Sequence, residues 1–222
     1  MTPRIVVLSA PSGGGKTTIA KAVREKYPER FGFSVSATTR KPRVGEQDGV
    51  DYHFWERQRF LDEVKAGRFL EHAEYGGELY GTLKTEVERV LQAGRHVLLD
   101  IEVEGARQVR EQHPPPRSVS IFILPSDPRV LVERLQNRKT ESPKEMKQRI
   151  DRARYELHQA AAFDHWIRND NLDEAVKDVV AVVEEKGRPR RTAQDLNWLN
   201  EYGYELQRIA QQVFDELRQG KG

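Results

Sequence analysis

A glycine-rich segment near the start of the chain has residue types suited to binding phosphate. It runs from Ala10 to Gly15 and is followed directly by Lys16 and Thr17. Successive glycines let backbone N–H groups converge on one anion, and the positive end of a following helix adds to that site. In the nucleotide-binding P-loop the lysine reaches the β- and γ-phosphates, and the next hydroxyl binds Mg²⁺. We therefore predict a triphosphate site with Lys16 on the phosphates and Thr17 on the magnesium ion.

The loop stands between the two elements that this motif requires. Branched apolar residues at 5–8 predict a buried strand, and the pattern over 18–27 predicts a helix closed by Pro28. Ala10 stands where the motif has its first glycine, and its methyl group is tolerable if the backbone keeps a negative φ there. The plain alternative is a flexible glycine-rich turn. The motif alone does not distinguish an ATPase, a GTPase and a kinase.

A second group of cations follows the next predicted strand. Residues 31–36 alternate apolar and polar, which predicts a half-buried strand, and Arg40, Lys41 and Arg43 come shortly after it. The planar fork of arginine matches the oxygens of phosphate, so this segment is a candidate second anion site. A solvated basic turn is the alternative that the sequence leaves open.

The order of predicted elements indicates an α/β fold with an insertion. Between residues 36 and 92, short strands and hairpin turns surround one predicted helix at 56–66, which suggests a small α+β insertion able to hold a second substrate. Apolar strands at 96–101 and 118–124 alternate with helices, and this alternation predicts a parallel sheet covered on both faces. Asp100 falls where open parallel sheets bind ligands, or it serves as a helix N-cap.

Cations also gather between residues 134 and 154, in two helical patterns joined by a short polar turn. Phosphoryl transfer needs cations that close over the transferring group and a cover that expels water. We therefore consider a mobile lid over this range. A pair of solvated helices, balanced by their own carboxylates, fits the sequence equally well.

The last part of the chain carries an apolar stripe at steps of three and four residues, which predicts one long amphipathic helix with Gly203 as its weak point. The stripe consists of Leu199, Tyr202, Leu206, Ile209, Val213 and Leu217. Packing against the rest of the chain and packing against a second copy, giving a homo-oligomer, both remain open.

The composition narrows the function classes. The 222 residues include 37 basic and 35 acidic side chains, for a net charge of +2, which gives little support to nucleic-acid binding. Cysteine is absent, so we expect neither disulfides nor thiolate metal sites, and the only expected metal is one carried by the nucleotide. No apolar run is long enough for a membrane span, and the first predicted strand leaves no room for a signal peptide. We expect a cytoplasmic protein without membrane contact.

Taken together, these segments resemble the guanylate kinase (GMP kinase) family of P-loop nucleoside monophosphate kinases. The likeness covers roughly residues 4–186 and rests on motifs at 9–18, 31–43, 69–73, 80–82, 99–101 and 167–170. It implies a P-loop three-layer α/β/α fold with a parallel central sheet. The core would comprise residues 1–35 and 93–186, the GMP-binding insertion 36–92, the helical lid 134–154 and a C-terminal helical tail 187–222.

The resemblance also implies roles for individual residues. ATP would be bound by Ala10, Pro11, Ser12, Gly13, Gly14, Gly15, Lys16, Thr17, Thr18 and, near the adenine, Asn169. The catalytic cations would be Lys16, Arg134, Arg138 and Arg149, with Arg152 a further lid candidate. The GMP phosphate would be held by Arg40, Arg43, Tyr52 and Tyr80, and the guanine would be contacted by Ser36, Glu71, Thr82 and Asp100.

Glu71 carries the specificity in this interpretation, with an exposed strand carboxylate as the plain alternative. Guanine offers adjacent N1–H and N2–H₂ donors that one carboxylate can accept, whereas adenine presents an acceptor at N1. The implied reaction is transfer of the γ-phosphoryl group of MgATP to GMP, which yields ADP and GDP. The rivals are a related P-loop kinase with another phosphorylated acceptor, such as AMP or a ribose bisphosphate, and a scaffold module of the same family. Scaffold versions lose loop and acceptor residues, and this chain keeps Lys16, Arg40 and Glu71 together.

Three positions depart from the family pattern. Ala10 replaces the first loop glycine, Glu102 stands where aspartate is common, and Lys139 stands where a lid glycine often follows Arg138. Glu102 keeps the charge on a longer arm, so we expect its contact geometry to differ from that of an aspartate, and Lys139 is expected to stiffen the lid turn. The tail from residue 187 lies outside the resemblance.

Overall fold

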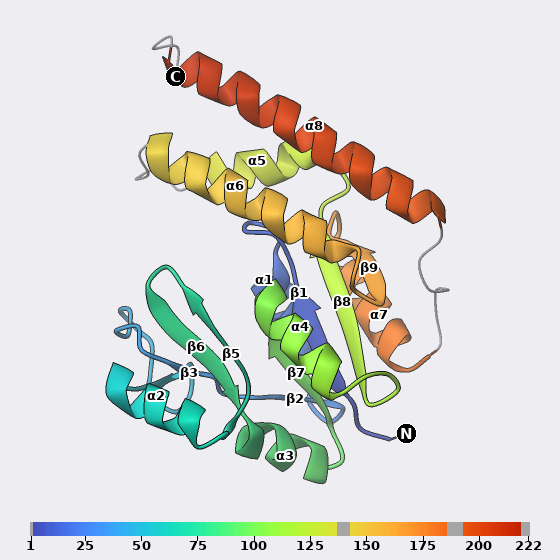
Figure 1. Ribbon diagram of the computed structural model, residues 1–222. Coiled ribbons are helices and arrows are strands. Elements are labelled where there is room, and N and C mark those ends of the chain that lie inside the picture. The colour runs from blue at the N-terminus through green and yellow to red at the C-terminus, as the bar shows by residue number, and fades with distance from the viewer. Residues whose placement is uncertain (1, 137–142, 186–192, 219–222) are drawn as a thin grey trace. The chain divides into compact units, whose positions relative to one another are not determined.

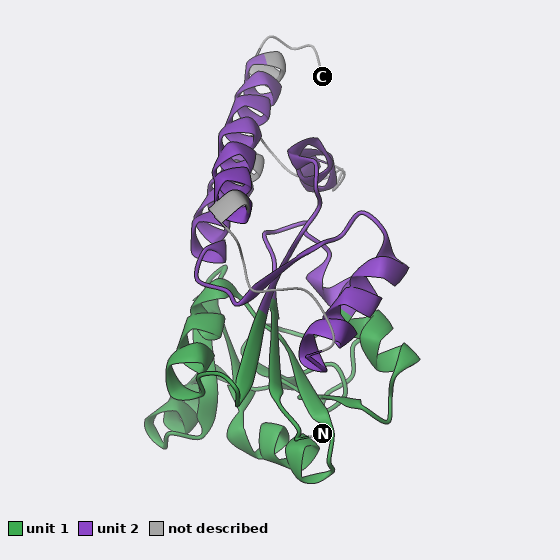
Figure 2. Cartoon of the chain, turned by 90° about the vertical axis from the view of Figure 1, so that its right-hand side faces the viewer, with its two compact units in different colours: residues 1–8, 20–120 green, residues 9–19, 121–222 purple. Residues whose placement is uncertain are grey.

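The structure is a computed structural model that describes residues 2–136, 143–185 and 193–218. Its contacts divide the chain into two compact units, coloured separately in Figure 2. The first unit comprises residues 1–8 and 20–120, and the second comprises residues 9–19 and 121–222. The phosphate loop therefore belongs to the second unit, and the predicted acceptor residues belong to the first.

The first unit contains three parallel strands of the central sheet. Strand β7 (His96–Asp100) pairs with β1 (Ile5–Ser9) on one side and with β2 (Phe31–Phe33) on the other. Leu8 lies opposite Asp100 in this register, so Asp100 stands at the carboxyl end of its strand, as the sequence predicts. Strand β1 is buried along its whole length, because both faces of a parallel sheet are covered.

The strand predicted over residues 31–36 is wrong in its extent. Strand β2 ends at Phe33, and the chain then joins a different sheet as β3 (Ala37–Thr38). Ser36 already belongs to this second pairing, because its carbonyl accepts a hydrogen bond from the amide of His53 at 2.9 Å. The alternating segment therefore extends over strands of two different sheets, β2 in the parallel sheet and β3 in the four-stranded sheet.

The second sheet has four strands in the order β4 (His53–Phe54), β3, β6 (Glu78–Leu83), β5 (Phe69–Tyr75). Strands β5 and β6 form an antiparallel hairpin, with Gly76 and Gly77 at positive φ in the turn. Helix α2 (Arg57–Lys65) closes one face, where the rings of Phe60 and Phe69 stack at a centroid distance of 4.5 Å. The opposite face is left for polar side chains.

The sequence reading missed one helix of the first unit. Helix α3 (Lys84–Gln92) follows β6 immediately, so the expectation of one helix between residues 36 and 92 is wrong. Its N-cap residue is Leu83, which offers no capping side chain and therefore gives no start signal. Helix α4 (Val103–Gln112) follows β7 and likewise begins without a side-chain cap.

The second unit repeats the strand and helix alternation. Strand β8 (Ser118–Leu124) is buried at every position and pairs in parallel with β9 (His165–Arg168). The first residues of helix α1 (Lys16–Lys26), up to Ile19, belong to this unit and follow the glycine loop directly. Helix α7 (Leu172–Val183) is capped by Asn171, whose side chain accepts from the Glu174 amide. The parallel strands and intervening helices confirm the predicted α/β class with a parallel sheet.

Helix α8 (Ala193–Arg218) forms most of the C-terminal tail. It lies along α5 (Pro128–Gln136) and α6 (Pro143–Ala160), as Figure 1 shows. The side chains of Leu199, Tyr202, Leu206 and Ile209 are buried within this single chain. At these four positions the apolar stripe packs against the rest of the same chain, which is one of the two packing modes that the sequence leaves open. No described helix has the length and apolarity to cross a membrane.

Candidate active site

The glycine loop in the second unit has the backbone geometry of an anion-binding loop. Gly13 and Gly15 have φ of 82° and 91°, a region that side chains rarely adopt, and Gly15 precedes the first residue of α1. A Cβ at Gly14 would come within 2.9 Å of the Ala10 Cβ. Among the described non-glycine residues, only Glu185 has a positive φ, so Ala10 meets the condition for carrying a methyl group.

Polar side chains from three distant elements hold this loop. Arg149 of α6 donates from Nη2 to Ser12 Oγ at 3.2 Å, and Arg134 of α5 donates from Nη1 to the Gly13 carbonyl at 3.4 Å. Asn169, just after β9, donates from Nδ2 to the Gly14 carbonyl at 2.9 Å. The structure thus brings two predicted lid arginines and the predicted adenine residue to the loop itself.

The remaining donor residues lie at the start of α1. Lys16 is half-buried, and the side chains of Thr17 and Thr18 are exposed at the helix N-terminus. Arg138 and Lys139 lie outside the described residues. Within the described ranges, no group of three His, Cys, Asp or Glu side chains is placed to hold a metal ion.

Glu156 of α6 is a loop contact that the sequence reading missed. Its side chain is 1% exposed, Oε2 accepts from the Ser12 amide at 3.0 Å, and Oε1 accepts from Arg152 Nε at 2.9 Å. The available signal was a carboxylate on the same helical face as the buried Ala153 and Ala160. A buried carboxylate needs a partner, and here the partners are a loop amide and an arginine.

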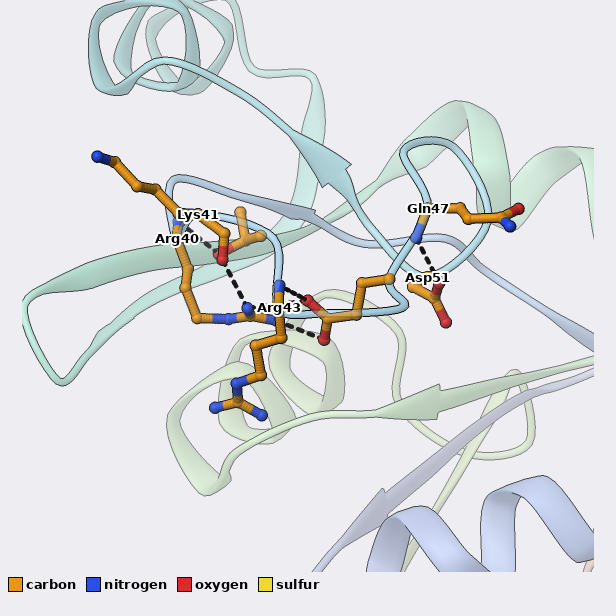
Figure 3. A network of polar contacts seen from close by, with 7 residues as sticks. Arg40, Lys41, Arg43, Gln47 and Asp51 are labelled. Carbon is orange, nitrogen blue, oxygen red and sulfur yellow. Dashed lines mark hydrogen bonds and ion pairs between the residues drawn. The ribbon is translucent and has the colours of Figure 1, made fainter.

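In the first unit, the predicted phosphate arginines branch from the turn in Figure 3. The Arg40 fork binds Glu46 at both carboxylate oxygens, with Nη1 to Oε2 at 3.0 Å and Nη2 to Oε1 at 2.9 Å. The Arg43 backbone amide donates to the same carboxylate at 2.7 Å. Hydrogen bonds, first from the Arg40 side chain and then from the Arg43 amide, lower the pKa of Glu46. The sequence reading missed Glu46, although an Arg and a Glu six residues apart around Pro42 and Gly45 are compatible with such a turn.

Two tyrosines lie beside this fork. The Arg40 guanidinium is 5.4 Å from the ring centroid of Tyr52, and the rings of Tyr52 and Tyr80 meet edge to face at 6.1 Å. The Glu46 carboxylate raises the pKa of Arg40, and Tyr80 adds a smaller effect in the same direction. Arg40, Tyr52 and Tyr80 therefore form one cluster, and Arg43 joins it through the Glu46 carboxylate that its amide shares with Arg40.

The register of the four-stranded sheet places two of the predicted guanine residues, Glu71 and Thr82, on the same face as Tyr80 of this cluster, whereas Asp100 lies in the parallel sheet. Thr38 lies opposite Tyr80 and Phe54, and Thr82 lies opposite Glu71, so these side chains share a face. Ser36 and Tyr52 lie two residues before Thr38 and Phe54, just outside the strands. An irregularity in β5 between Phe69 and Glu71 shifts the register, so Glu71 is paired with Thr82 and not placed on the face of Phe69. The face opposite carries the apolar residues under α2.

Glu71 is held in place on that face. It is 5% exposed, and its Oε1 accepts a hydrogen bond from Thr82 Oγ1 at 2.6 Å. Oε2 lies only 2.2 Å from where a Cβ would stand on Gly105, in the first turn of α4. The absent side chain at Gly105 therefore makes room for the carboxylate, and the positive helix end there favours a negative charge. The plain alternative of an exposed strand carboxylate is wrong.

A parallel α/β chain with a glycine loop ahead of its first helix, and with arginines contacting that loop, has the features of a P-loop nucleotide phosphotransferase. The guanylate kinase family model matches residues 2–186. The chain is 47% identical to guanylate kinase of Chlorobium chlorochromatii (strain CaD3), over 81% of this chain and 94% of that one. It is 49% identical to guanylate kinase of Frankia casuarinae, over 81% of this chain and 96% of that one. The crystal structure of guanylate kinase from Anaplasma phagocytophilum matches with a TM-score of 0.65 at 30% identity, covering 92% of this chain and 96% of that one. This chain belongs to the guanylate kinase family.

Proposed function

We propose that this chain transfers the γ-phosphoryl group of MgATP to GMP, giving ADP and GDP. The observation that carries the proposal is the buried carboxylate of Glu71. It lies on the same sheet face as Tyr80, whose ring contacts Tyr52 beside Arg40. A purine monophosphate needs both features, a base-reading group and a phosphate-binding cation. AMP is the natural competitor, because it carries the same ribose phosphate.

Glu71 supports GMP over AMP by hydrogen-bond chemistry. Thr82 donates to Oε1, Oε2 lies at the α4 turn, and a carboxylate has acceptor sites on both oxygens, so one carboxylate can accept from N1–H and N2–H₂ of guanine together. Adenine would set its N1 acceptor against this negative charge. Leaving a buried polar group unpaired costs far more than a missing methylene, so discrimination can reach several orders of magnitude. Ser36, Thr82 and Asp100 complete the proposed guanine contacts.

The GMP phosphate is proposed to bind Arg40, Arg43, Tyr52 and Tyr80. In the structure, Glu46 satisfies the Arg40 fork, so phosphate must displace or rearrange that carboxylate. Phosphate carries more negative charge than a carboxylate and suits the same bidentate geometry. The exchange keeps Arg40 paired before and after binding.

The donor is proposed to bind the loop from Ala10 to Thr18, with Lys16 on the β- and γ-phosphates. Arg134, Arg149 and Arg138 would neutralise charge on the transferring group, since positioning and electrostatics supply most of the rate in phosphoryl transfer. We keep the 134–154 lid as part of this proposal. Asn169 supports the loop through Gly14, and its adenine contact stays a prediction.

Magnesium fits the donor set of the loop. The exposed Thr17 hydroxyl is a hard oxygen ligand at the start of α1, and Mg²⁺ binds through few protein oxygens together with water and substrate phosphates. Thr17 would hold the ion, which supplies charge neutralisation on the phosphates. The cytoplasmic location, the domain limits at residues 36, 92 and 186, and a homo-oligomer through the tail stay predictions.

An acceptor screen tests the proposed function. Purified protein is assayed with MgATP and either GMP, AMP, CMP or UMP, with ADP release followed by a coupled enzyme system. The proposal expects rapid turnover with GMP and rates near the background hydrolysis with the other three. A comparable rate with AMP would overturn the reading of Glu71, and background rates with all four would favour the scaffold alternative.

A further inference from the structure

Helix α8 lies beyond residue 186, where the family match ends, and packs on the two helices that carry the lid arginines. Leu206 is fully buried at this interface, and Leu199 and Tyr202 are nearly so. A helix held by this much apolar burial is part of the fold of the second unit, not a loose appendage. Its placement raises the question of what it does for the donor site.

The first half of α8 contacts the segment that supports the loop. The ring of Trp198 lies 6.4 Å from that of Trp166 and 5.1 Å from the guanidinium of Arg168, both residues of β9. Strand β9 ends at Arg168, and the next residue, Asn169, bonds the Gly14 carbonyl. The Trp198 contact is therefore linked to the glycine loop through the Arg168–Asn169 peptide and one hydrogen bond.

The second half of α8 contacts the other support of the loop. Gln207 Oε1 accepts a hydrogen bond from Arg154 Nη2 at 3.0 Å, and Arg154 is a residue of α6. The same helix carries Arg149 and Glu156, and both bond Ser12. The loop is thus held from two sides, and α8 contacts the element on each side.

Tyr202 lies between Trp198 and Gln207 along α8, within electrostatic reach of Asp127 in the turn before α5 and of Asp170 in the turn after β9. Its hydroxyl is buried, and among the described residues it has no hydrogen-bond partner. Burial, and then the charges of Asp127 and Asp170, raise the pKa of this phenol. Asp170 accepts from both the amide and the hydroxyl of Ser126, and Asp127 accepts from the Arg129 amide at the start of α5. Tyr202 therefore lies near the residue that precedes α5 and near the turn that follows β9.

We infer that α8 is a positioning element of the donor site. It fixes α6 and the end of β9 against each other, and so presets the glycine loop and Arg149 for the triphosphate. No residue of α8 touches the loop in the described contacts, so its action is indirect. All of these contacts lie in the second unit. Loss of the α8 contacts should therefore weaken the binding of ATP and leave the binding of GMP unchanged. The inference rests on the proposed donor site, but not on the identity of the acceptor.

The test compares two aromatic positions of the same helix. Trp198→Ala removes the contact with β9, and Tyr204→Ala is the matched control, because Tyr204 is 77% exposed. Binding of the non-hydrolysable ATP analogue AMP-PNP with Mg²⁺, and of GMP, is measured by calorimetry on the full chain. Contacts of this kind modulate coupling between sites by a few-fold to about 30-fold. We expect Trp198→Ala to raise the Kd of AMP-PNP about fivefold, with the Kd of GMP unchanged.

A second variant guards against simple loss of folding. Gln207→Ala removes the hydrogen bond from Arg154 without opening the core, and we expect about a twofold rise in the Kd of AMP-PNP. Unchanged AMP-PNP binding in both folded variants would overturn the inference. So would an equal loss of GMP binding, or an equal effect of Tyr204→Ala. If wild-type protein binds AMP-PNP but phosphorylates AMP, the proposed acceptor fails and the inference on α8 stands.

Discussion

The two candidate sites are prepared for their ligands in different ways. In the first unit, Arg40, the proposed phosphate cation, is held by Glu46, which lies six positions away in the same turn. In the second unit, Ser12 is held by Glu156 and Arg149, at separations of 144 and 137 positions. The pairing of the Arg40 fork is thus local in sequence. The donor loop depends on a helix that lies much later in the sequence.

This difference indicates which changes each site tolerates. A change in α6 or after β9 can disturb the donor loop without touching a substrate, because Glu156 and Asn169 act on backbone groups of the loop. The acceptor face has its remote supports in α4. The missing side chain of Gly105 admits the Glu71 carboxylate, and Gln108 and Gln112 bond backbone groups of β5.

The largest expected effect is that of Lys16→Ala, which removes the proposed phosphate cation of the donor loop. Turnover should fall by about 10²-fold or more, since each preorganised charge on a transferring group contributes on this scale. The measurement is kcat with saturating GMP, with circular dichroism to show an intact fold. A near-normal kcat would remove Lys16 from the chemistry.

Glu71→Gln tests the acceptor side. The amide cannot accept at both atoms, so kcat/KM for GMP should fall about 10- to 100-fold, the range expected for a hydrogen bond to a charged group. The rate with AMP should not fall, so the ratio of kcat/KM for GMP to that for AMP should decrease. Glu74→Gln, an exposed position on the same strand, is the matched control. An unchanged ratio of GMP to AMP would separate Glu71 from base recognition.

Glu156→Gln tests whether the donor loop depends on a distant carboxylate. The variant keeps the size of the side chain but removes the charge that Ser12 and Arg152 share, so the KM for ATP should rise about tenfold. The KM for GMP should stay the same. Asp151→Asn, on an exposed position of the same helix, serves as the control. Equal rises in both KM values would show that the two sites are not supported separately.

Glu46→Gln should have the smallest effect and the opposite sign. Without the competing carboxylate, the Arg40 fork is more available to phosphate, so the KM for GMP should fall by a small factor at neutral pH. The pKa of Glu46 is lowered, so the pair with Arg40 persists below the usual carboxyl range and is lost as the pH falls through that lowered pKa. The ratio of KM values between variant and wild type should therefore approach one in acid. A higher KM at neutral pH would show that Glu46 supports the bound state, and Glu56→Gln controls for general loss of charge.

Local patterns explain what could be predicted from the sequence. The glycine loop with its flanking strand and helix, and the hairpin that carries Glu71 and Thr82, depend on neighbours along the chain. The sequence does not signal helix α3, because Leu83 is not a capping residue. The predicted strand at 31–36 is longer than β2, because the alternation of apolar and polar residues continues into a second sheet. Glu156 was missed because its partner lies far away in sequence. The packing of α8 was open because an apolar stripe does not identify what covers it.

The most direct test of separate donor and acceptor sites measures two affinities on two variants. Calorimetry gives the Kd of GMP and of Mg²⁺ with AMP-PNP for wild-type protein, Lys16→Ala and Glu71→Gln. We predict that Lys16→Ala weakens AMP-PNP and leaves GMP binding unchanged, while Glu71→Gln weakens GMP and leaves AMP-PNP binding unchanged. Both variants weakening both ligands to the same extent would contradict the assignment of one nucleotide to each unit.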